Sequence, residues 1–194
     1  MKKISLVIAG LIMAFAVNAQ TTKWDFDKSH SKVTFTVAHM MITDVMGSFG
    51  KYSGSVLSDK EDFSDAKVTF NIEVSSINTD DSGRDKHLQS PDFFNVEKFP
   101  EIAFVSKSMK NVGKGMYKMT GDFTMMGVTK SIVLDVKYAG TVKDPYGNIK
   151  AGFKISGTID RTLWGLKYNS AMDAGGLMIG NDVAILSYVE LKKI

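Results

Sequence analysis

Hydrophobic and polar residues alternate with a period of two along most of this chain, which is typical of β-strands that bury one face. The alternation is cleanest over residues 31–39 and 67–75, where valine, phenylalanine and isoleucine fall on one face and mostly polar residues on the other. Short turns separate such segments, and residues 144–148 form the clearest of these turns. Further strands are predicted over 24–27, 49–57, 102–109, 117–125, 132–138, 153–159 and 183–191.

These segments amount to eight long strands, or nine with the short first one. Tight turns join most of them, so neighbouring strands are expected to be antiparallel. The strands are long for a small two-sheet sandwich, whose strands usually run to about five or six residues. Closure into a barrel would also remove both sheet edges, so we predict an all-β fold, an extended eight-stranded antiparallel β-barrel.

Two stretches break the alternation. Residues 40–47 are predicted to form a short helix or a loop. Residues 79–90 can form a short helix between strands, with Thr79 or Asp80 as its N-cap. Leu88 is the only apolar residue of this helix, so we expect it to dock through Leu88 and the phenylalanines that follow it.

The polar residues of this helix allow two interpretations. Arg84 could bind the acidic head group of a ligand through its guanidinium. Equally, Arg84 and Asp85 could only pin the helix to the barrel, which we favour because an isolated charge pair is usually structural. His87 and His39 are the other candidate head-group contacts, although a rim histidine bonded to a neighbour is the favoured reading of His39.

The start of the chain has the pattern of a secretory signal. Lys2 and Lys3 precede an apolar run over 4–17, and small or short side chains follow at 17–19. The run is shorter than the roughly 20 residues that a membrane-spanning helix needs. We therefore predict a signal peptide over 1–19 and one domain over 20–194. The chain has no cysteine, so we expect a soluble periplasmic protein with no disulfide, no lipid tether and no stable membrane insertion.

Charge and motifs argue against several classes of protein. Without Lys2 and Lys3, 22 of the 24 basic residues remain against 21 acidic ones, which does not suit a nucleic-acid binder. The histidines at 30, 39 and 87 lack metal-ligand spacing, so neither a metal site nor another cofactor is predicted. We also find no nucleophile elbow, phosphate loop or dinucleotide fingerprint.

The apolar face of the strands is where we place the function. Ten methionines remain after the predicted signal, and this flexible side chain suits a surface that moulds around an apolar guest. A barrel simply filled by its side chains would use similar residues, but the glycines at 121, 152 and 157 favour free space. The predicted lining consists of Phe35, Val37, Phe70, Ile72, Phe104, Phe123, Leu134, Phe153 and Ile155.

Several short segments recur in the order and spacing of a known family. They include His30-Ser31, Gly47-Ser48-Phe49, Arg84-Asp85-Lys86-His87-Leu88-Gln89-Ser90, Asp92-Phe93-Phe94 and Arg161. In these segments the chain resembles the YceI-like, or polyisoprenoid-binding, family of exported bacterial proteins, over essentially all of 24–190. The resemblance implies a lipocalin-like barrel whose elongated pocket holds a long isoprenoid lipid or a quinone-like molecule. It also implies no established enzymatic activity, and dimers occur in the family.

One departure from the family pattern is Trp164, which stands where phenylalanine is more common. If its side chain faces the pocket, it contacts the ligand and shortens the cavity. The prediction is thus a carrier, not an enzyme, for a long-chain amphiphile such as a polyisoprenoid or isoprenoid quinone. The alternatives are a lipid-modifying enzyme that uses His39 or His87 with Asp85, and a ligand-free barrel that binds a partner.

Overall fold

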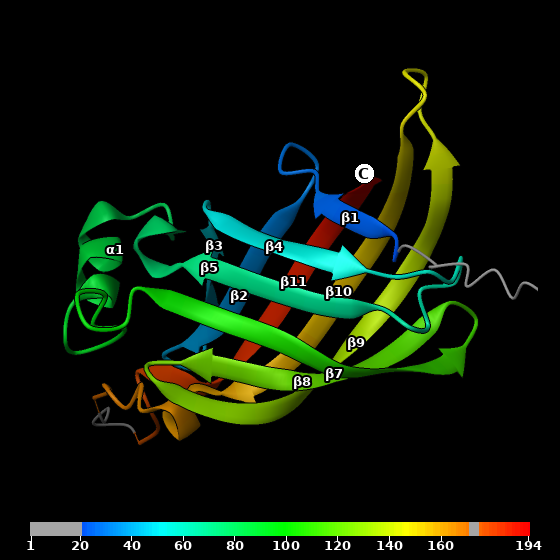
Figure 1. The fold of residues 1–194 in the computed structure, drawn as a ribbon. Helices are drawn as coiled ribbons and strands as arrows, with labels where there is room; N and C mark the ends of the chain where they lie inside the picture. Colours follow the sequence, from blue (N-terminus) through cyan, green and yellow to red (C-terminus); the bar gives the residue numbers. More distant parts are fainter. Residues whose placement is uncertain (1–20, 171–174) are drawn as a thin grey trace, which may run out of the picture.

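The computed structural model describes residues 21–170 and 175–194, so the predicted signal peptide over 1–19 lies outside the described residues. Described residues form a β-barrel with one short α-helix (Figure 1). Its helix is α1 (Ser82–Gln89), and two 3-10 turns cover Val74–Ser76 and Arg161–Trp164. The strands are β1 (Lys23–Phe26), β2 (Lys32–His39), β3 (Thr43–Phe49), β4 (Tyr52–Leu57), β5 (Lys67–Glu73), β6 (Ile77–Asn78), β7 (Glu101–Gly113), β8 (Met116–Met125), β9 (Val128–Lys143), β10 (Ile149–Asp160) and β11 (Ile179–Lys193).

The sheet closes on itself through antiparallel pairs. Strands β1, β4, β5, β7, β8, β9, β10 and β11 follow one another in hydrogen-bonded order, and β11 pairs back onto β1. Strand β2 also pairs with β11, over residues 179–188 and thus before the residues 191–193 that pair with β1, and β3 pairs with β2. The short strand β6 pairs with β3 and completes that end of the wall. The predicted eight-stranded antiparallel barrel with a short helix is therefore confirmed.

The prediction of a short helix or a loop over 40–47 was wrong for residues 43–47, which belong to strand β3, whereas residues 40–42 do form a turn. Strand β3 begins at Thr43, after a turn in which Met40 and Met41 have positive φ angles of 53° and 61°. The alternation was hidden because Met46 faces outward and Gly47 faces inward. A Cβ atom on Gly47 would lie 2.3 Å from Cζ of Phe35, so the inward position must lack a side chain.

The strand glycines were also misread. A Cβ atom on Gly121 would lie 2.4 Å from Cζ of Phe104, and one on Gly157 would lie 2.6 Å from Cδ2 of Leu134. These glycines make room for large inward side chains and do not themselves leave free space. The inference from glycine to free space was therefore wrong for Gly121 and Gly157, whereas a Cβ atom on Gly152 would make an ordinary contact of 3.5 Å with Cβ of Ala139. The lumen does hold cavities, as described below.

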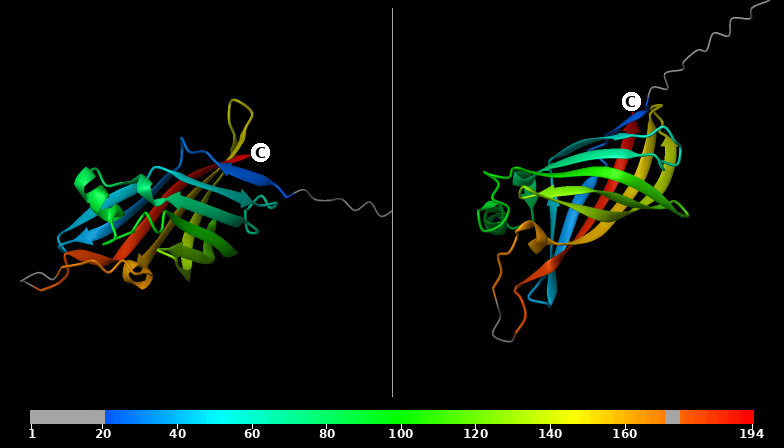
Figure 2. Two further views of the ribbon diagram at one scale, coloured as in Figure 1. Left: turned by 60° about the vertical axis from the view of Figure 1, so that its left-hand side comes forward. Right: turned by 60° about the horizontal axis from the view of Figure 1, so that its bottom comes forward.

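The helix α1 lies beside one end of the barrel (Figures 1 and 2). Its N-cap is Asp81, not Thr79 or Asp80, and the Asp81 carboxylate accepts from the backbone N–H of Arg84 at 2.9 Å. Leu88 packs against the core, as expected from its being the only apolar residue of the helix. Among the described residues, no helix has the length and apolar character needed to cross a membrane.

The loop between β4 and β5 plugs the barrel with Phe63, which is 1% exposed. Its ring centroid lies 4.9 Å from those of Trp24 and Phe153 and 5.4 Å from that of Tyr138. The Asp65 carboxylate holds the loop in shape by accepting from the Ser58 hydroxyl at 2.6 Å and from the next backbone N–H at 3.0 Å. The alternation of apolar and polar residues could not predict that Phe63 is buried, because Phe63 lies in a loop and not in a strand.

Candidate ligand-binding site

Two apolar cavities, each of about 130 Å³, lie inside the barrel that the described residues form. We call them the first and second chambers. The first chamber is lined by Phe26, Val33, Val56, Ala66, Val68, Phe70, Ile72, Phe104, Met109, Met119, Phe123, Ile132, Leu134, Val136, Phe153, Ile155, Ile185, Ser187, Val189 and Leu191. The second chamber is lined by Val33, Thr34, Phe35, Val37, Phe49, Ile72, Leu88, Phe93, Phe94, Ile102, Phe123, Met125, Ile159, Arg161, Leu166, Ile179, Val183 and Ile185.

Four side chains belong to both walls and form what we call the waist. They come from four strands, β2, β5, β8 and β11, and are Val33, Ile72, Phe123 and Ile185. Because the same side chains bound both cavities, the chambers lie next to each other on either side of the waist. Together they form an elongated apolar space whose long walls are supplied by the alternating inward residues of the strands.

Polar side chains are scarce on these walls. Among the described residues, the first chamber has one, Ser187, and the second has Thr34 and Arg161. The Thr34 hydroxyl already donates to the Leu186 carbonyl at 2.7 Å. Burial of an apolar guest, not polar recognition, is therefore the main interaction that this space can offer.

The predicted lining residues all face this space, although ligand contact itself stays a prediction. Two of the nine predicted residues, Phe35 and Val37, line only the second chamber. The other seven line the first chamber, two of them as part of the waist: Phe70, Ile72, Phe104, Phe123, Leu134, Phe153 and Ile155. The prediction missed the inward methionines at 109, 119 and 125, whose positions a full reading of the same alternation would have indicated.

Trp164 does not belong to either wall, and it is 2% exposed. Its indole N–H donates to the Phe123 carbonyl at 3.2 Å, and its ring meets the Phe123 ring edge-on at 5.4 Å. Trp164 thus packs against Phe123 of the waist without lining either chamber. Contact between Trp164 and a ligand would require this packing to change.

Removing the Phe123 ring should therefore change which chains the lumen accepts. In Phe123→Leu we expect the affinity for a long prenol, solanesol, relative to a short one, farnesol, to rise about tenfold, since one more buried isoprene unit would suffice. Displacement of a fluorescent apolar probe measures this ratio. Phe104→Leu is the control because Phe104 lines only the first chamber. An equal change in both variants would contradict a role for the waist.

The polar residues of α1 bind the protein itself. Arg84 donates from Nε to the Thr79 hydroxyl at 2.8 Å and from Nη2 to the Thr79 carbonyl at 2.7 Å. Asp85 accepts from the backbone N–H of Thr79 at 2.9 Å and from its hydroxyl at 2.6 Å. This geometry matches the pinning interpretation, and neither residue lines a chamber.

The two histidines offered as head-group contacts also lie outside the walls. His87 Nε2 is 3.1 Å from Asp92, and its ring packs edge-on against Phe93 and Tyr168. His39 pairs with Ile179 at the end of β2. Among the described residues neither histidine bonds to Asp85, so the acid–base pairs of the enzyme alternative are not assembled here.

Arg161, which entered the sequence analysis only through the family resemblance, is a buried cation with 4% exposure. It donates to the carbonyls of Leu166 at 2.6 Å, Gly180 at 2.9 Å and Tyr168 at 3.1 Å. Burial lowers the pKa of its guanidinium. These bonds fasten the segment after β10 to the start of β11, beside the second chamber, and no local pattern in the sequence would reveal such distant partners.

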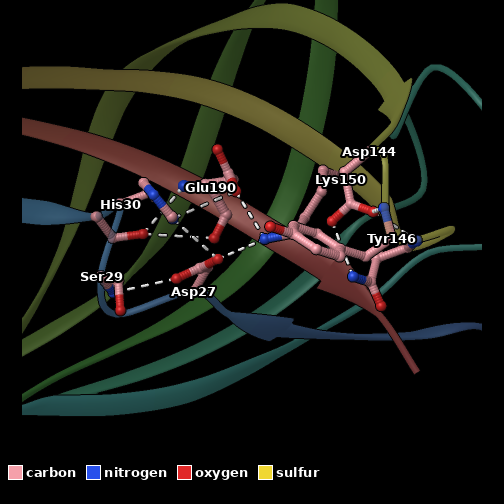
Figure 3. A network of polar contacts seen from close by, with 9 residues as sticks. Asp27, Ser29, His30, Asp144, Tyr146, Lys150 and Glu190 are labelled. Atoms are coloured by element: carbon pink, nitrogen blue, oxygen red, sulfur yellow. Dashed lines mark hydrogen bonds and ion pairs between the residues drawn. The ribbon is translucent and has the colours of Figure 1, made fainter.

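A second polar cluster lies on the outer face of the barrel (Figure 3). Lys150 forms ion pairs with Asp27 and, at 2.8 Å, with Glu190, while His30 Nδ1 lies 3.1 Å from Asp27. Asp27, His30 and Glu190 could in principle hold a cation, but the Lys150 ammonium already occupies the space between the two carboxylates. The cluster therefore ties the turn after β1 to β10 and β11.

This cluster predicts a pH dependence of stability. The hydrogen bond from Lys150 is the main cause that holds the pKa of Asp27 far below its usual range. The stabilisation is therefore complete above the unfolded pKa of about 3.9 and is lost as the pH falls below it. We expect Asp27→Asn to destabilise the protein at pH 7, and the difference from wild type to shrink in acid.

Urea denaturation at a series of pH values measures this difference. Asp44→Asn is the matched control because Asp44 is exposed on β3. A constant difference between wild type and Asp27→Asn from neutral pH to well below pH 3.9 would contradict the prediction.

The described residues thus define a closed antiparallel β-barrel with an apolar lumen. Residues 24–191 match the YceI-like domain, and the chain belongs to this family. A UPF0312 protein of Staphylococcus aureus strain USA300 is 40% identical over 163 residues, which cover 84% of this chain and 92% of the relative.

Solved structures share the fold. The Campylobacter jejuni YceI protein superposes with a TM-score of 0.69 at 32% identity, over 80% of this chain and 88% of the other. A Saccharophagus degradans polyisoprenoid-binding domain implicated in plant cell wall breakdown has a TM-score of 0.62 at 15% identity, over 87% of this chain and 97% of that domain. At this last level of identity the likeness concerns the fold alone.

Proposed function

We propose that the protein is an exported, periplasmic carrier that binds one long-chain amphiphile, a polyisoprenoid or an isoprenoid quinone, in its two chambers. The observation that carries the proposal is the apolar wall of both chambers, to which the described part of the chain contributes three polar side chains. The description of the Saccharophagus degradans domain as polyisoprenoid-binding supports the same class of ligand.

The energetics favour a chain over a head group as the source of affinity. Burial of one methylene contributes about 0.8 kcal/mol, so a five-carbon isoprene unit contributes roughly 3–4 kcal/mol before ordering costs. A few such units exceed what one polar head group usually adds. Arg84 and His87 need no role in this binding, which agrees with their bonds to Thr79 and Asp92.

Organic extraction of the purified protein, followed by mass spectrometry, tests the proposal. We expect an isoprenoid lipid or quinone in the extract, in an amount close to that of the protein. Empty extracts from protein that also fails to bind added solanesol would contradict the carrier function. Signal cleavage and periplasmic location are tested separately by fractionating cells and sequencing the N-terminus of the exported protein.

A homodimer remains a prediction drawn from the family. Sedimentation velocity of the purified protein over a range of concentrations tests it directly. Binding rather than catalysis is the proposed role, and incubation of bound lipid with the protein should return the lipid chemically unchanged.

A further inference from the structure

Large apolar side chains are exposed where β2 turns into β3. Met41 is 73% exposed and Ile42 is 81% exposed. Met40, at 41%, donates its backbone N–H to the carbonyl of Met178 at 2.8 Å, which brings the start of β11 alongside. We call Met40, Met41, Ile42, Leu177 and Met178 the apolar tip; Figure 2 shows the β2–β3 turn and the start of β11 at the same end of the barrel.

Neither turn chemistry nor core packing explains these residues. Met40 and Met41 both have positive φ angles, a backbone conformation that costs roughly 1–2 kcal/mol for such side chains. Three residues separate the paired residues His39 and Thr43, and a hairpin turn with positive φ at two successive residues normally uses asparagine and glycine there. The chain instead places large apolar side chains in a strained turn that faces water, and such breaks of local rules are expected at functional sites.

The apolar tip continues the wall of the second chamber. Val37 and Val183 face that chamber and are paired with each other across β2 and β11. Ile179 also lines the chamber and pairs with His39, the residue directly before Met40. The wall of the second chamber therefore reaches Ile179 and its partner His39, directly beside the apolar tip.

The size and shape of the apolar tip point to a bilayer. Its five side chains present a few hundred Å², whereas a stable protein–protein interface buries about 800 Å² on each partner. The tip is a projecting hairpin without an aromatic anchor, unlike the centre of most protein interfaces. Thr43 and Asp44 are exposed directly after it, which limits insertion to the turn itself.

We propose that the apolar tip inserts peripherally into the interfacial region of a lipid bilayer and so brings the second chamber to the membrane surface. The role of this contact in loading rests on the proposed carrier function, because a long isoprenoid resides in the bilayer. The contact itself requires only the exposed side chains.

Flotation with vesicles of phosphatidylethanolamine and phosphatidylglycerol tests this contact, using protein without the predicted signal peptide. We expect wild type to float with the vesicles and Met41→Glu/Ile42→Glu to lose at least about tenfold in partitioning. Tyr146→Glu is the matched control, because Tyr146 is 90% exposed in the hairpin between β9 and β10. It should bind as wild type does.

Three results would overturn the proposal: no binding by wild type, equal binding by the tip variant, or a wild-type dimer that the tip variant disrupts. Circular dichroism of each variant shows whether the barrel has formed, and lipid extraction is run in parallel. Binding to vesicles by protein whose extracts contain no lipid would support insertion of the apolar tip and contradict the carrier function. Lipid in the extracts without vesicle binding would leave the carrier function and end the docking proposal.

Discussion

Phe63→Ala is expected to lower the free energy of unfolding by about 3–5 kcal/mol, as removal of a buried phenylalanine usually does. Phe63 is 1% exposed and its ring contacts three aromatic rings, those of Trp24, Tyr138 and Phe153. The loop that carries it is held by Asp65 and by the Tyr117 hydroxyl, which donates to the Asp62 carbonyl at 2.5 Å. The wall cannot collapse easily onto the space left behind.

Urea denaturation of lipid-free protein measures this loss. Leu163→Ala is the control, because Leu163 is 55% exposed and its truncation should change stability by about 0.5 kcal/mol or less. A loss below about 1 kcal/mol in Phe63→Ala would show that the loop does not act as a plug. Because the loss is a large fraction of the 5–15 kcal/mol typical of domains, partial unfolding at 37 °C is also expected.

The strands could be predicted because each buries one face, which makes apolar and polar residues alternate with a period of two in its sequence. The predicted strand 67–75 corresponds to β5, which ends at Glu73 where a 3-10 turn begins. Strand β3 was not predicted, because its inward position at Gly47 carries no side chain and its outward position at Met46 is apolar. A glycine gives no such signal, because it has no side chain whose polarity could indicate burial.

The contacts between distant residues could not be predicted in this way. Lys150 and Asp27 are separated by 123 residues and meet only because the barrel closes β1 onto β11. The waist is a similar case, because alternation shows that Phe123 and Ile185 face inward, but the register of the strands decides that both line the same two chambers. For the same reason the sequence did not show that Trp164 packs behind Phe123.

Leu134→Trp is expected to reduce the amount of lipid that copurifies with the protein at least tenfold, because its ring would fill part of the first chamber. Leu134 lines that chamber and is 8% exposed. Val133 is its neighbour on β9 but faces solvent, with 53% exposure, so Val133→Trp is the matched control. The two variants add a similar side chain to opposite faces of one strand.

Stability distinguishes blocking from unfolding. Overpacking of a core position typically costs about 1–3 kcal/mol, which the free energy of unfolding of lipid-free Leu134→Trp should reveal. A folded Leu134→Trp barrel that retains as much lipid as Val133→Trp would show that the ligand lies elsewhere. A folded Leu134→Trp barrel without lipid, beside a loaded Val133→Trp, would place the chain of the ligand in the first chamber, where the sequence offers one polar side chain, Ser187, and an otherwise apolar wall.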